Sequence, residues 1–488
     1  MKNIVEQKGS IEIQTWGAVE GHVTGSKYGL YGKNFRVLID CGLFQGKDDE
    51  RSPKGERRNF TPTELSARGV TEVLLSHVHI DHSGNLPTLF RDGFTPRILT
   101  TEITARFLGI MLQNSAEIQS AEHKENRLYT LDDVRKTMSH LKIVEPFTQI
   151  PVGQKHSEIT AEFVLNGHIE GACSILLRIR GERGKHNILF TGDMGKRGQS
   201  LCGGYEEWTR HYPQESVHTL VVESTNFLNE PISFRQKKEN LFTEIREVWR
   251  RGGNPLLPVL SMHRFQEIIE MLHNSGKELD PGEDFMVVLD APLAMKLLRE
   301  YKSLSPSQLS RRYGDDPNFY RTDKDSLSRF ELKHCRIIES HDDSILASDE
   351  YANYCGKAII LASGGMVEHG RSQLWYRGSF CENPKNEVIL TCFQVPGTRG
   401  EALLHDQMVR NGRERGARVK KIEGFTSHIS GPEETFKFLG KFNLGQLRRV
   451  IITHGKDNAR QAMAEEFRRR GYEVDIFLPR LKDRIALQ

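Results

Sequence analysis

The residues with the clearest capacity for chemistry lie at positions 76–84, where the sequence is SHVHIDHSG. His77 and His79 are two positions apart in a loop after a predicted strand, so both imidazoles can face one ion. Asp81 and His82 follow at once and can diverge towards a second ion. Imidazole and carboxylate ligands suit Zn²⁺, and the lack of a nearby cysteine argues against a closed structural site. The pattern therefore predicts a metal site, the alternative being a surface cluster of histidines.

A site for two ions needs further ligands, and three candidates stand at the ends of other predicted strands. His168 follows the run FVLN, Asp193 closes ILFTGD, and His454 closes VIITH. Each alone would more often be a turn or core residue, but three in the same context favour ligands. Asp40, in VLIDCG, is either a turn residue or a carboxylate that orients a ligating imidazole.

Regular elements must position these side chains. Short apolar runs that stop at polar residues or glycine predict strands at 36–40, 72–76, 188–191 and 219–223. Helix formers predict helical segments at 103–141 and at 233–250, the latter capped by Ser233. Alternation of this kind predicts a layered α/β architecture.

The middle of the chain changes character around Pro231 and returns to the first pattern around Gly424. Between them, apolar runs predict buried strands at 254–261, 285–289, 357–362 and 387–392. We interpret this region as a second α/β domain inserted into the first. A polar stretch at 303–332 is expected to be a surface excursion, and 457–488 to be a terminal helix and strand of the first domain rather than a separate binding module.

Composition excludes several classes of protein. The chain has 488 residues, 37% hydrophobic and 27% charged, with no apolar run near the length of a membrane helix. Charges near the N-terminus interrupt any signal peptide, so we expect a cytoplasmic protein without a membrane partner. The seven cysteines form no CxxC pair, which disfavours zinc ribbons and disulfide scaffolds. A net charge of +3 does not by itself argue for nucleic acid.

The order of Asp40, the HxHxDH motif, His168 and Asp193 resembles the four N-terminal motifs of the metallo-β-lactamase superfamily. That resemblance implies an αββα sandwich with two Zn²⁺ at the strand ends. It implies that Asp40 orients a ligand and that Asp193 bridges the ions. The remaining ligands would be His77, His79 and His168 for the first ion, and Asp81, His82 and His454 for the second.

Three further motifs resemble motifs A, B and C of the β-CASP group, the nucleic-acid-cleaving branch of that superfamily. They are Glu223 in VVESTNF, His428 in GFTSHIS and His454 in ITHGK. Similarity extends through SMHRFQEII, LASGGMVEHGR and LTCFQVPGTRG, and is nearest to bacterial and archaeal relatives of the cleavage and polyadenylation endonuclease subunit. The implied domains are a metallo-β-lactamase domain at 1–226 and 425–488 and a β-CASP cassette at 227–424.

The resemblance implies a ribonuclease acting on single-stranded RNA, because the DNA-processing branch is known for an aliphatic residue at the position of His454. His428 would be the general acid, with Glu223 accepting its other N–H. Asp81 is a candidate both as ligand and in catalysis.

Substrate phosphates would be held by backbone N–H groups of a glycine-rich turn, with Arg264 as a clamp. The turn comprises Ser363, Gly364, Gly365 and Met366. A structural ion pair is the alternative for Arg264. A DNA nuclease and a small-molecule hydrolase with the insert as a lid remain alternatives for the whole chain. Internal cutting, cutting from a 5′ end and a homodimer are left open.

Overall fold

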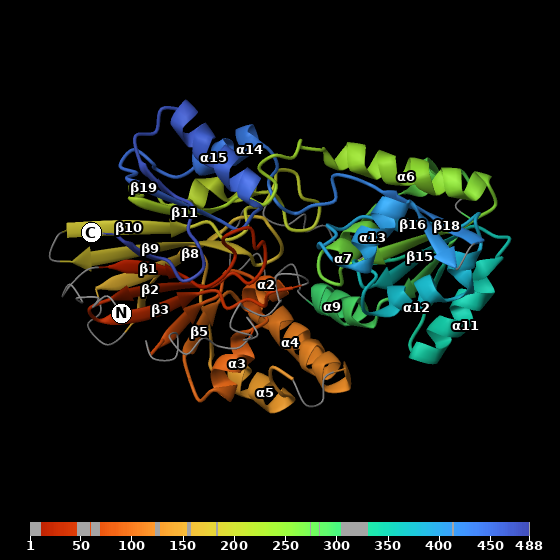
Figure 1. Cartoon of the computed structure of the whole chain (residues 1–488), viewed down its shortest axis with the longest axis horizontal. Coiled ribbons are helices and arrows are strands. Elements are labelled where there is room, and N and C mark those ends of the chain that lie inside the picture. Colours follow the sequence, from red (N-terminus) through yellow and green to blue (C-terminus); the bar gives the residue numbers. More distant parts are fainter. Residues whose placement is uncertain are drawn as a thin grey trace. The chain divides into compact units, whose positions relative to one another are not determined.

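The computed structural model describes residues 11–45, 59, 69–122, 127–153, 158–181, 184–273, 275–282, 284–303, 330–411 and 414–487. The chain forms two compact units, shown in Figure 1: a host unit of Met1–Pro231 with Ser427–Gln488, and an inserted unit of Ile232–Thr426. These breaks fall a few residues beyond the expected 226 and 424. The excursion expected at 303–332 lies mostly outside the described residues.

Among the residues that the structure describes, the host unit contains two seven-stranded sheets. The first has the order β21-β1-β2-β3-β4-β5-β6, with bounds Arg484–Ala486, Glu12–Thr15, Tyr28–Gly32, Phe35–Ile39, Glu72–Leu74, Arg97–Thr100 and Leu141–Ile143. The second has the order β20-β19-β11-β10-β9-β8-β7, with bounds Asp475–Phe477, Arg449–Thr453, Thr219–Glu223, Gly184–Phe190, Cys173–Gly181, Ile159–Leu165 and Gln149–Val152. The C-terminal segment therefore supplies strands to both sheets, because β21 pairs with β1 and β19 with β11.

Helices cover the outer face of each host sheet, as Figure 1 shows. On one side lie α3 (Leu86–Arg91), α4 (Glu102–Glu122) and α5 (Leu131–Ser139), and on the other α14 (Pro432–Leu439) and α15 (Asp457–Arg469). The short α2 (Ile80–Ser83) and η2 (Tyr205–His211) lie in loops between strands. The αββα sandwich implied by the resemblance is thus confirmed.

The region 103–141 differs from the single helical segment that its composition suggested. The structure divides it into α4 and α5, followed by β6. Thr130 begins α5 with a capping box, in which its hydroxyl accepts from the Asp133 N–H and the Asp133 side chain accepts from the Thr130 N–H. This reciprocal cap satisfies two backbone donors and favours a new helix start over a continuous helix.

The described part of the inserted unit forms one seven-stranded sheet of order β14-β13-β15-β12-β16-β18-β17. The bounds in that order are Cys335–Ile337, Met286–Asp290, Ala358–Ser363, Pro255–Val259, Glu387–Leu390, Glu414–Lys421 and Met408–Asn411. All pairs are parallel except the edge pair β17 and β18. Parallel strands buried on both faces explain the continuous apolar runs that predicted them.

Helices flank this sheet, and the first begins where the sequence predicted. Ser233 caps α6 (Phe234–Arg250) by accepting from the Gln236 N–H. The others are α7 (Arg264–His273), α8 (Gly276–Leu279), α9 (Pro292–Ser303), α11 (His341–Ala352), α12 (Arg371–Arg377), η5 (Ser379–Glu382) and α13 (Arg399–Asp406). Trp375 and Phe380 pack with Leu256 and Ile360 in the core under one face. Among the described residues, no helix is both long and apolar enough to cross a bilayer.

A stacked pair of buried histidines joins β10 to the start of β11. The rings of His186 and His218 lie 5.4 Å apart at an interplanar angle of 27°. His218 Nδ1 accepts from the Asn187 N–H (3.0 Å), and His218 Nε2 donates to Gln446 Oε1 (3.1 Å), so this ring is used in its neutral form. His186 Nε2 lies 2.9 Å from Thr219 Oγ1. Burial lowers the pKa of both rings, that of His186 to about 4.

Acidification is therefore expected to destabilise the host unit. The unfolded state takes up protons first, so stability is lost as pH falls from about 6.5 towards the lowered pKa of His186, at a cost on the order of 2 kcal/mol. His186→Gln removes this titration and should flatten the loss. Urea unfolding of both proteins at about pH 7.5 and pH 5, in chelator so that metal ligation does not contribute, checks this. Equal pH dependence in the two proteins would contradict it.

Candidate metal centre

Four of the predicted ligands converge where strands of the host sheets end. His77 and His79 follow β4, His168 follows β8, and Asp193 follows β10. One ligand atom from each lies within 4.8 Å of the others, and we call these residues the first ligand group. His79 Nδ1 is 3.1 Å from His77 Nε2 and 3.2 Å from His168 Nε2. Three imidazole nitrogens at this spacing can share one cation.

The other predicted ligands form a second ligand group of Asp81, His82 and His454, again with ligand atoms within 4.8 Å of one another. Asp81 and His82 lie in α2, and His454 follows β19 in the C-terminal part of the host unit. His454 Nε2 is 3.5 Å from Asp81 Oδ2 and 3.3 Å from His82 Nε2. Residues 372 positions apart in the chain therefore meet at one site.

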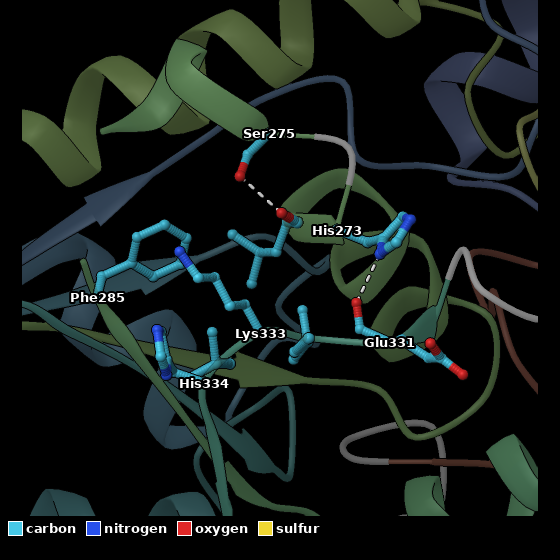
Figure 2. A pocket seen from close by; sticks show the side chains of 9 residues that line it. His273, Ser275, Phe285, Glu331, Lys333 and His334 are labelled. Atoms are coloured by element: carbon cyan, nitrogen blue, oxygen red, sulfur yellow. Dashed lines mark hydrogen bonds between the residues drawn. The ribbon is translucent and has the colours of Figure 1, made fainter. Parts of the chain in front are cut away.

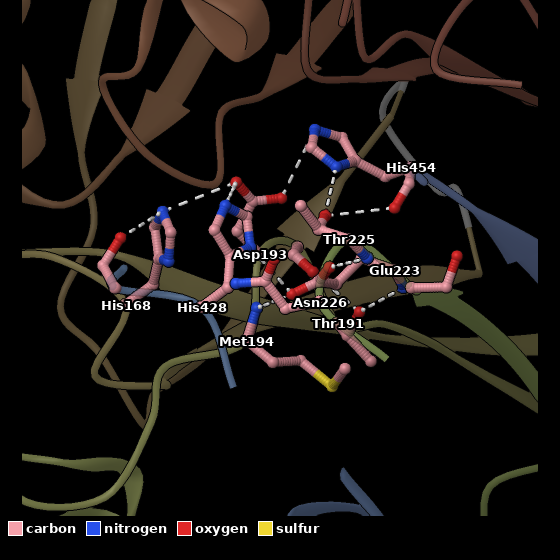
Figure 3. A network of polar contacts seen from close by, with 12 residues as sticks. His168, Thr191, Asp193, Met194, Glu223, Thr225, Asn226, His428 and His454 are labelled. Carbon is pink, nitrogen blue, oxygen red and sulfur yellow. Dashed lines mark hydrogen bonds and ion pairs between the residues drawn. The ribbon is translucent and has the colours of Figure 1, made fainter. Parts of the chain in front are cut away.

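Asp193 lies between the two groups. Its Oδ2 faces the first, 3.4 Å from His168 Nε2 and 3.6 Å from His77 Nε2. Its Oδ1 faces the second, 3.2 Å from His82 Nε2 and 3.6 Å from His454 Nε2. Figure 3 shows this carboxylate between His168 and His454. A carboxylate with one oxygen towards each group has the geometry required of a bridging ligand.

Hydrogen bonds on the far side of two rings, His82 and His77, fix which nitrogen faces the site. His82 Nδ1 donates to Asp40 Oδ2 at 2.7 Å, the contact that the predicted orienting role of Asp40 requires. The Ser76 hydroxyl donates to the same oxygen at 2.8 Å and lies 3.0 Å from His77 Nδ1. Each of these imidazoles therefore presents Nε2 to the site, as outer partners of metal-binding histidines do.

Thr225 is a residue that sequence reasoning missed. Its Oγ1 lies 2.8 Å from His454 Nδ1 and donates to the His454 carbonyl oxygen at 3.1 Å, so it orients this ring as Asp40 orients His82. The only signal was a hydroxyl two positions after Glu223, which is equally typical of a turn. His454 and Asp40 both have positive φ, 44° and 57°, a conformation that non-glycine residues adopt at a cost and mainly at functional sites.

Thr225→Val removes the hydroxyl and keeps the shape of the side chain. We expect metal affinity at the second ligand group to fall about 10- to 100-fold, the usual effect of losing an outer hydrogen bond to a ligating imidazole. Titration against a chelator of known affinity measures this. Thr225→Ser keeps the oxygen and should retain the wild-type affinity. Equal affinities for the valine and serine variants would remove Thr225 from the site.

The two groups differ in electrostatics. Burial lowers the pKa of His77, His79 and His168, that of His79 to about 4, so these rings are neutral at pH 7 and keep a lone pair for a cation. Burial has the same tendency at His82 and His454, but nearby carboxylates, first of all Asp193, outweigh it and raise their pKa.

Neighbouring histidines keep the Asp193 carboxylate negatively charged. Burial favours its neutral form, but His454 and His82 outweigh burial and hold its pKa well below the usual value. The centre therefore combines a permanent buried carboxylate with surroundings that favour positive charge. Such surroundings suit bound cations, and the set of five imidazoles and two carboxylates fits divalent metal ions of the kind that prefer nitrogen and oxygen ligands.

His428 and Glu223 lie beside this centre and are joined to each other, as Figure 3 shows. His428 Nδ1 donates to Glu223 Oε1 at 3.0 Å, and His428 Nε2 is 3.6 Å from Asp193 Oδ2. Glu223 also accepts from the backbone N–H groups of Met194 (3.0 Å) and Thr225 (2.8 Å). Burial lowers the pKa of His428, but Glu223 and Asp193 outweigh it and raise the pKa to about 9. The ring therefore keeps a proton facing the site.

The predicted phosphate-binding residues all lie in the inserted unit. Arg264 is 6% exposed, and its Nη1 forms an ion pair with the buried Glu267. This favours the structural alternative for Arg264, and its role as a clamp stays a prediction. In the turn after β15, the Gly364 N–H donates to the Val259 carbonyl oxygen (3.1 Å) and is not free for an oxyanion. For Ser363, Gly365 and Met366 the phosphate-binding role stays a prediction.

The inserted unit also has a pocket of about 360 Å³, shown in Figure 2. Phe285, which precedes β13, and His334, which precedes β14, line it together with the end of α7. It therefore lies at the amino ends of parallel strands, whereas ligands of open α/β sheets usually bind beyond the carboxyl ends. The His273 ring already donates to the Glu331 carbonyl oxygen at 2.5 Å.

An αββα sandwich that gathers these ligands at its strand ends defines a metal-dependent hydrolase. The chain belongs to the metallo-β-lactamase superfamily, whose family model matches residues 24–233, and it carries a Beta-Casp domain matched at residues 265–403. The family identified from the motifs is thereby confirmed.

Several proteins are similar to this chain over most of its length. Probable RNase MJ4 of Methanocaldococcus jannaschii is 28% identical over 93% of this chain and 94% of its own. Ribonuclease TTHA0252 of Thermus thermophilus is 26% identical over 96% and 98%. Transcription termination factor FttA of Cenarchaeum symbiosum is 26% identical over 93% and 67%. A solved protein of unknown function from Enterococcus faecalis has a TM-score of 0.53 at 15% identity, covers 98% of this chain and all of its own, and shows the fold alone.

Proposed function

We propose that the protein is a zinc-dependent ribonuclease that hydrolyses phosphodiester bonds in single-stranded RNA, with two Zn²⁺ per chain. The observation that carries this proposal is the position of Asp193, one carboxylate oxygen towards each ligand group, with His428 alongside. The names of full-length relatives support RNA as the substrate, since two of them are called ribonucleases. The seven nitrogen- and oxygen-bearing ligands support zinc and a pair of ions.

When bound, the two cations supply Lewis acidity, which stabilises negative charge at phosphorus and makes water an effective nucleophile near neutral pH. The candidate ligands fit that task because they approach from several strand ends of the host unit, with His77, Asp193 and His454 all buried. Asp81 would act as a ligand of the second group, where His454 and His82 lower the pKa of its carboxyl.

His428 would donate a proton to the leaving oxygen. Its Nδ1–H is held by Glu223, so the proton available for transfer is on Nε2, which faces Asp193. A raised pKa keeps that proton in place at neutral pH, and imidazole gives it up readily once the leaving oxygen gains charge. Ser363, Gly365 and Met366 would present backbone N–H groups to a neighbouring phosphate, as turns of this kind do.

A labelling experiment tests the function. Purified protein is incubated with single-stranded RNA labelled at the 5′ end, or at the 3′ end, with and without a chelator. We expect metal-dependent cleavage of RNA, and the two labels distinguish internal cuts from removal of nucleotides at the 5′ end. Competition with DNA of the same sequence separates a ribonuclease from a DNA nuclease. Turnover of simple esters without RNA cleavage would instead indicate a small-molecule hydrolase.

We also propose a cytoplasmic protein, since the processing of RNA in solution needs no membrane attachment. Light scattering of the metal-loaded sample distinguishes a monomer from a homodimer.

A further inference from the structure

Two large apolar side chains are exposed at the carboxyl edge of the inserted sheet. Leu260 follows β12 directly and is 42% exposed, and Phe393 lies shortly after β16 and is 52% exposed. The other exposed large apolar residues described in this unit, Ile337, Ile345 and Leu346, belong to β14 and α11 rather than to this edge. In an open α/β sheet, ligands bind beyond the carboxyl ends of the strands.

Leu260 and Phe393 lie in the loops that follow two neighbouring strands, and both loops contact the glycine-rich turn. β12 and β16 are parallel neighbours, with Leu256 opposite Val388. A Cβ placed on Gly365 would lie 3.2 Å from Leu260 Cδ2 and 2.9 Å from Cys392 Sγ, so the turn packs against both loops. Phe393 follows Cys392 directly in the chain.

The backbone under Phe393 is firmly held. Gln394 is buried, and its Nε2 donates to the carbonyl oxygens of Gly365 (2.9 Å) and Cys392 (3.0 Å), which ties the loops after β15 and β16 together. An aromatic ring on a fixed backbone loses little conformational freedom on binding, as in the aromatic anchors of interfaces.

A cationic side chain lies just below the same edge. Arg264 begins α7 after the loop that follows β12, and its buried Nε has no hydrogen-bond partner among the described residues. The Arg264 guanidinium also lowers the pKa of the nearby Cys392 thiol, although burial, the larger influence, raises it. Because its guanidinium is buried and paired with Glu267, Arg264 stabilises the start of α7 under this edge.

We propose that Phe393, with Leu260 at its side, is a stacking platform for a nucleobase of the RNA substrate. This inference rests on the proposed function and adds that the inserted unit selects unpaired nucleotides. Two side chains are far too few for a protein interface, which needs roughly 800 Å² per partner, but they match the face of one base. Stacking is tolerant of sequence and is available only to a base that is out of a duplex.

The test couples removal of the ring to removal of the base. Single abasic nucleotides are placed in turn along a short single-stranded RNA, and kcat/KM is measured for wild type and for Phe393→Ala. For wild type, one position should be sensitive, with a loss of roughly ten-fold or more, the size of one base–aromatic stack. Phe393→Ala should lose a similar factor on intact RNA and show no further loss at that position. Phe393→Trp should keep the wild-type pattern.

Two control variants lie elsewhere in the same unit. Leu346→Ala truncates an apolar side chain that is 65% exposed on α11, and His334→Ala removes a ring from the pocket at the opposite edge of the sheet. Both should cleave RNA as wild type does. A loss confined to His334→Ala would move base binding to that pocket and overturn the proposal.

A binding measurement separates failure of this inference from failure of the proposed function. In chelator, fluorescence anisotropy with labelled single-stranded RNA and with its duplex should give a preference for the single strand, reduced roughly ten-fold or more by Phe393→Ala. Equal affinities of wild type and Phe393→Ala for the single strand overturn the platform, even if RNA is cleaved. Absence of cleavage by a wild-type protein that shows the expected binding would overturn the nuclease function alone.

Discussion

His428→Ala is expected to lower kcat for RNA cleavage by about two to four orders of magnitude, the usual contribution of general acid–base catalysis. The reason is the geometry of the ring, which has Nδ1 held by Glu223 and Nε2 turned towards Asp193. His428 lies outside the two ligand groups defined above, so we expect the variant to keep the metal content of wild type. A third set of possible ligand atoms, on Asp193, Glu223 and His428, makes metal analysis of the variant essential. Single-turnover cleavage and elemental analysis on the same preparation measure both quantities.

Glu223→Gln provides the partner for a double-mutant cycle. It removes the charge that favours the protonated ring, so it should reduce activity less than His428→Ala does. If the two residues act as a unit, the double variant should be no slower than His428→Ala alone, because effects within such a unit are not additive. Full activity of His428→Ala would exclude this residue as the general acid.

Asp193→Ala should have the other large effect, because it removes a ligand from both groups at once. We expect fewer than two metal ions per chain and a loss of RNA cleavage of at least roughly three orders of magnitude, since bound metal contributes several kcal/mol of charge stabilisation. Elemental analysis and cleavage assays check this, and chelation of wild type should give the same loss. Zinc added back should restore wild type and not the variant.

Asp132→Ala is the matched control. This aspartate lies on α5 of the same unit, is 62% exposed, and pairs with Lys136 on its own helix. Its loss should leave metal content and activity unchanged. If Asp193→Ala retained two ions and wild-type activity, the bridging role would be wrong.

Much of the host unit could be predicted because its chemistry is concentrated in short signals. A polar residue at the end of an apolar run marks the carboxyl end of a strand, and His168, Asp193 and His454 all stand in that position. The spacing of these residues along the sequence gives no information on how far apart their strands lie in the sheet. That Asp193 directs one oxygen to each ligand group follows from the order of β8, β10, β11 and β19 in the sheet, which no local pattern specifies.

The misses have local causes. The capping box at Thr130 was present in the sequence, but the helix formers on either side outweighed it in the interpretation of 103–141. Thr225 was overlooked because a hydroxyl after a strand is usually a turn residue. The clamp role of Arg264 is not one of these misses and stays a prediction, although the structure shows that the guanidinium is paired with Glu267. Tertiary packing decides which partner such a side chain finds, and no local pattern in the sequence specifies it.

The path of the chain through the host unit sets the moment at which a nascent polypeptide becomes active. β11, which ends at Glu223, pairs with β19, which precedes His454. In the other sheet β1 pairs with β21, more than 450 residues later in the sequence. During synthesis the first 231 residues therefore leave the ribosome without His428 and His454, and the inserted unit must follow before either histidine is made. Pairing partners so distant in sequence also close slowly. A hydrolase assembled in this order stays inert until synthesis has passed the inserted unit and β19.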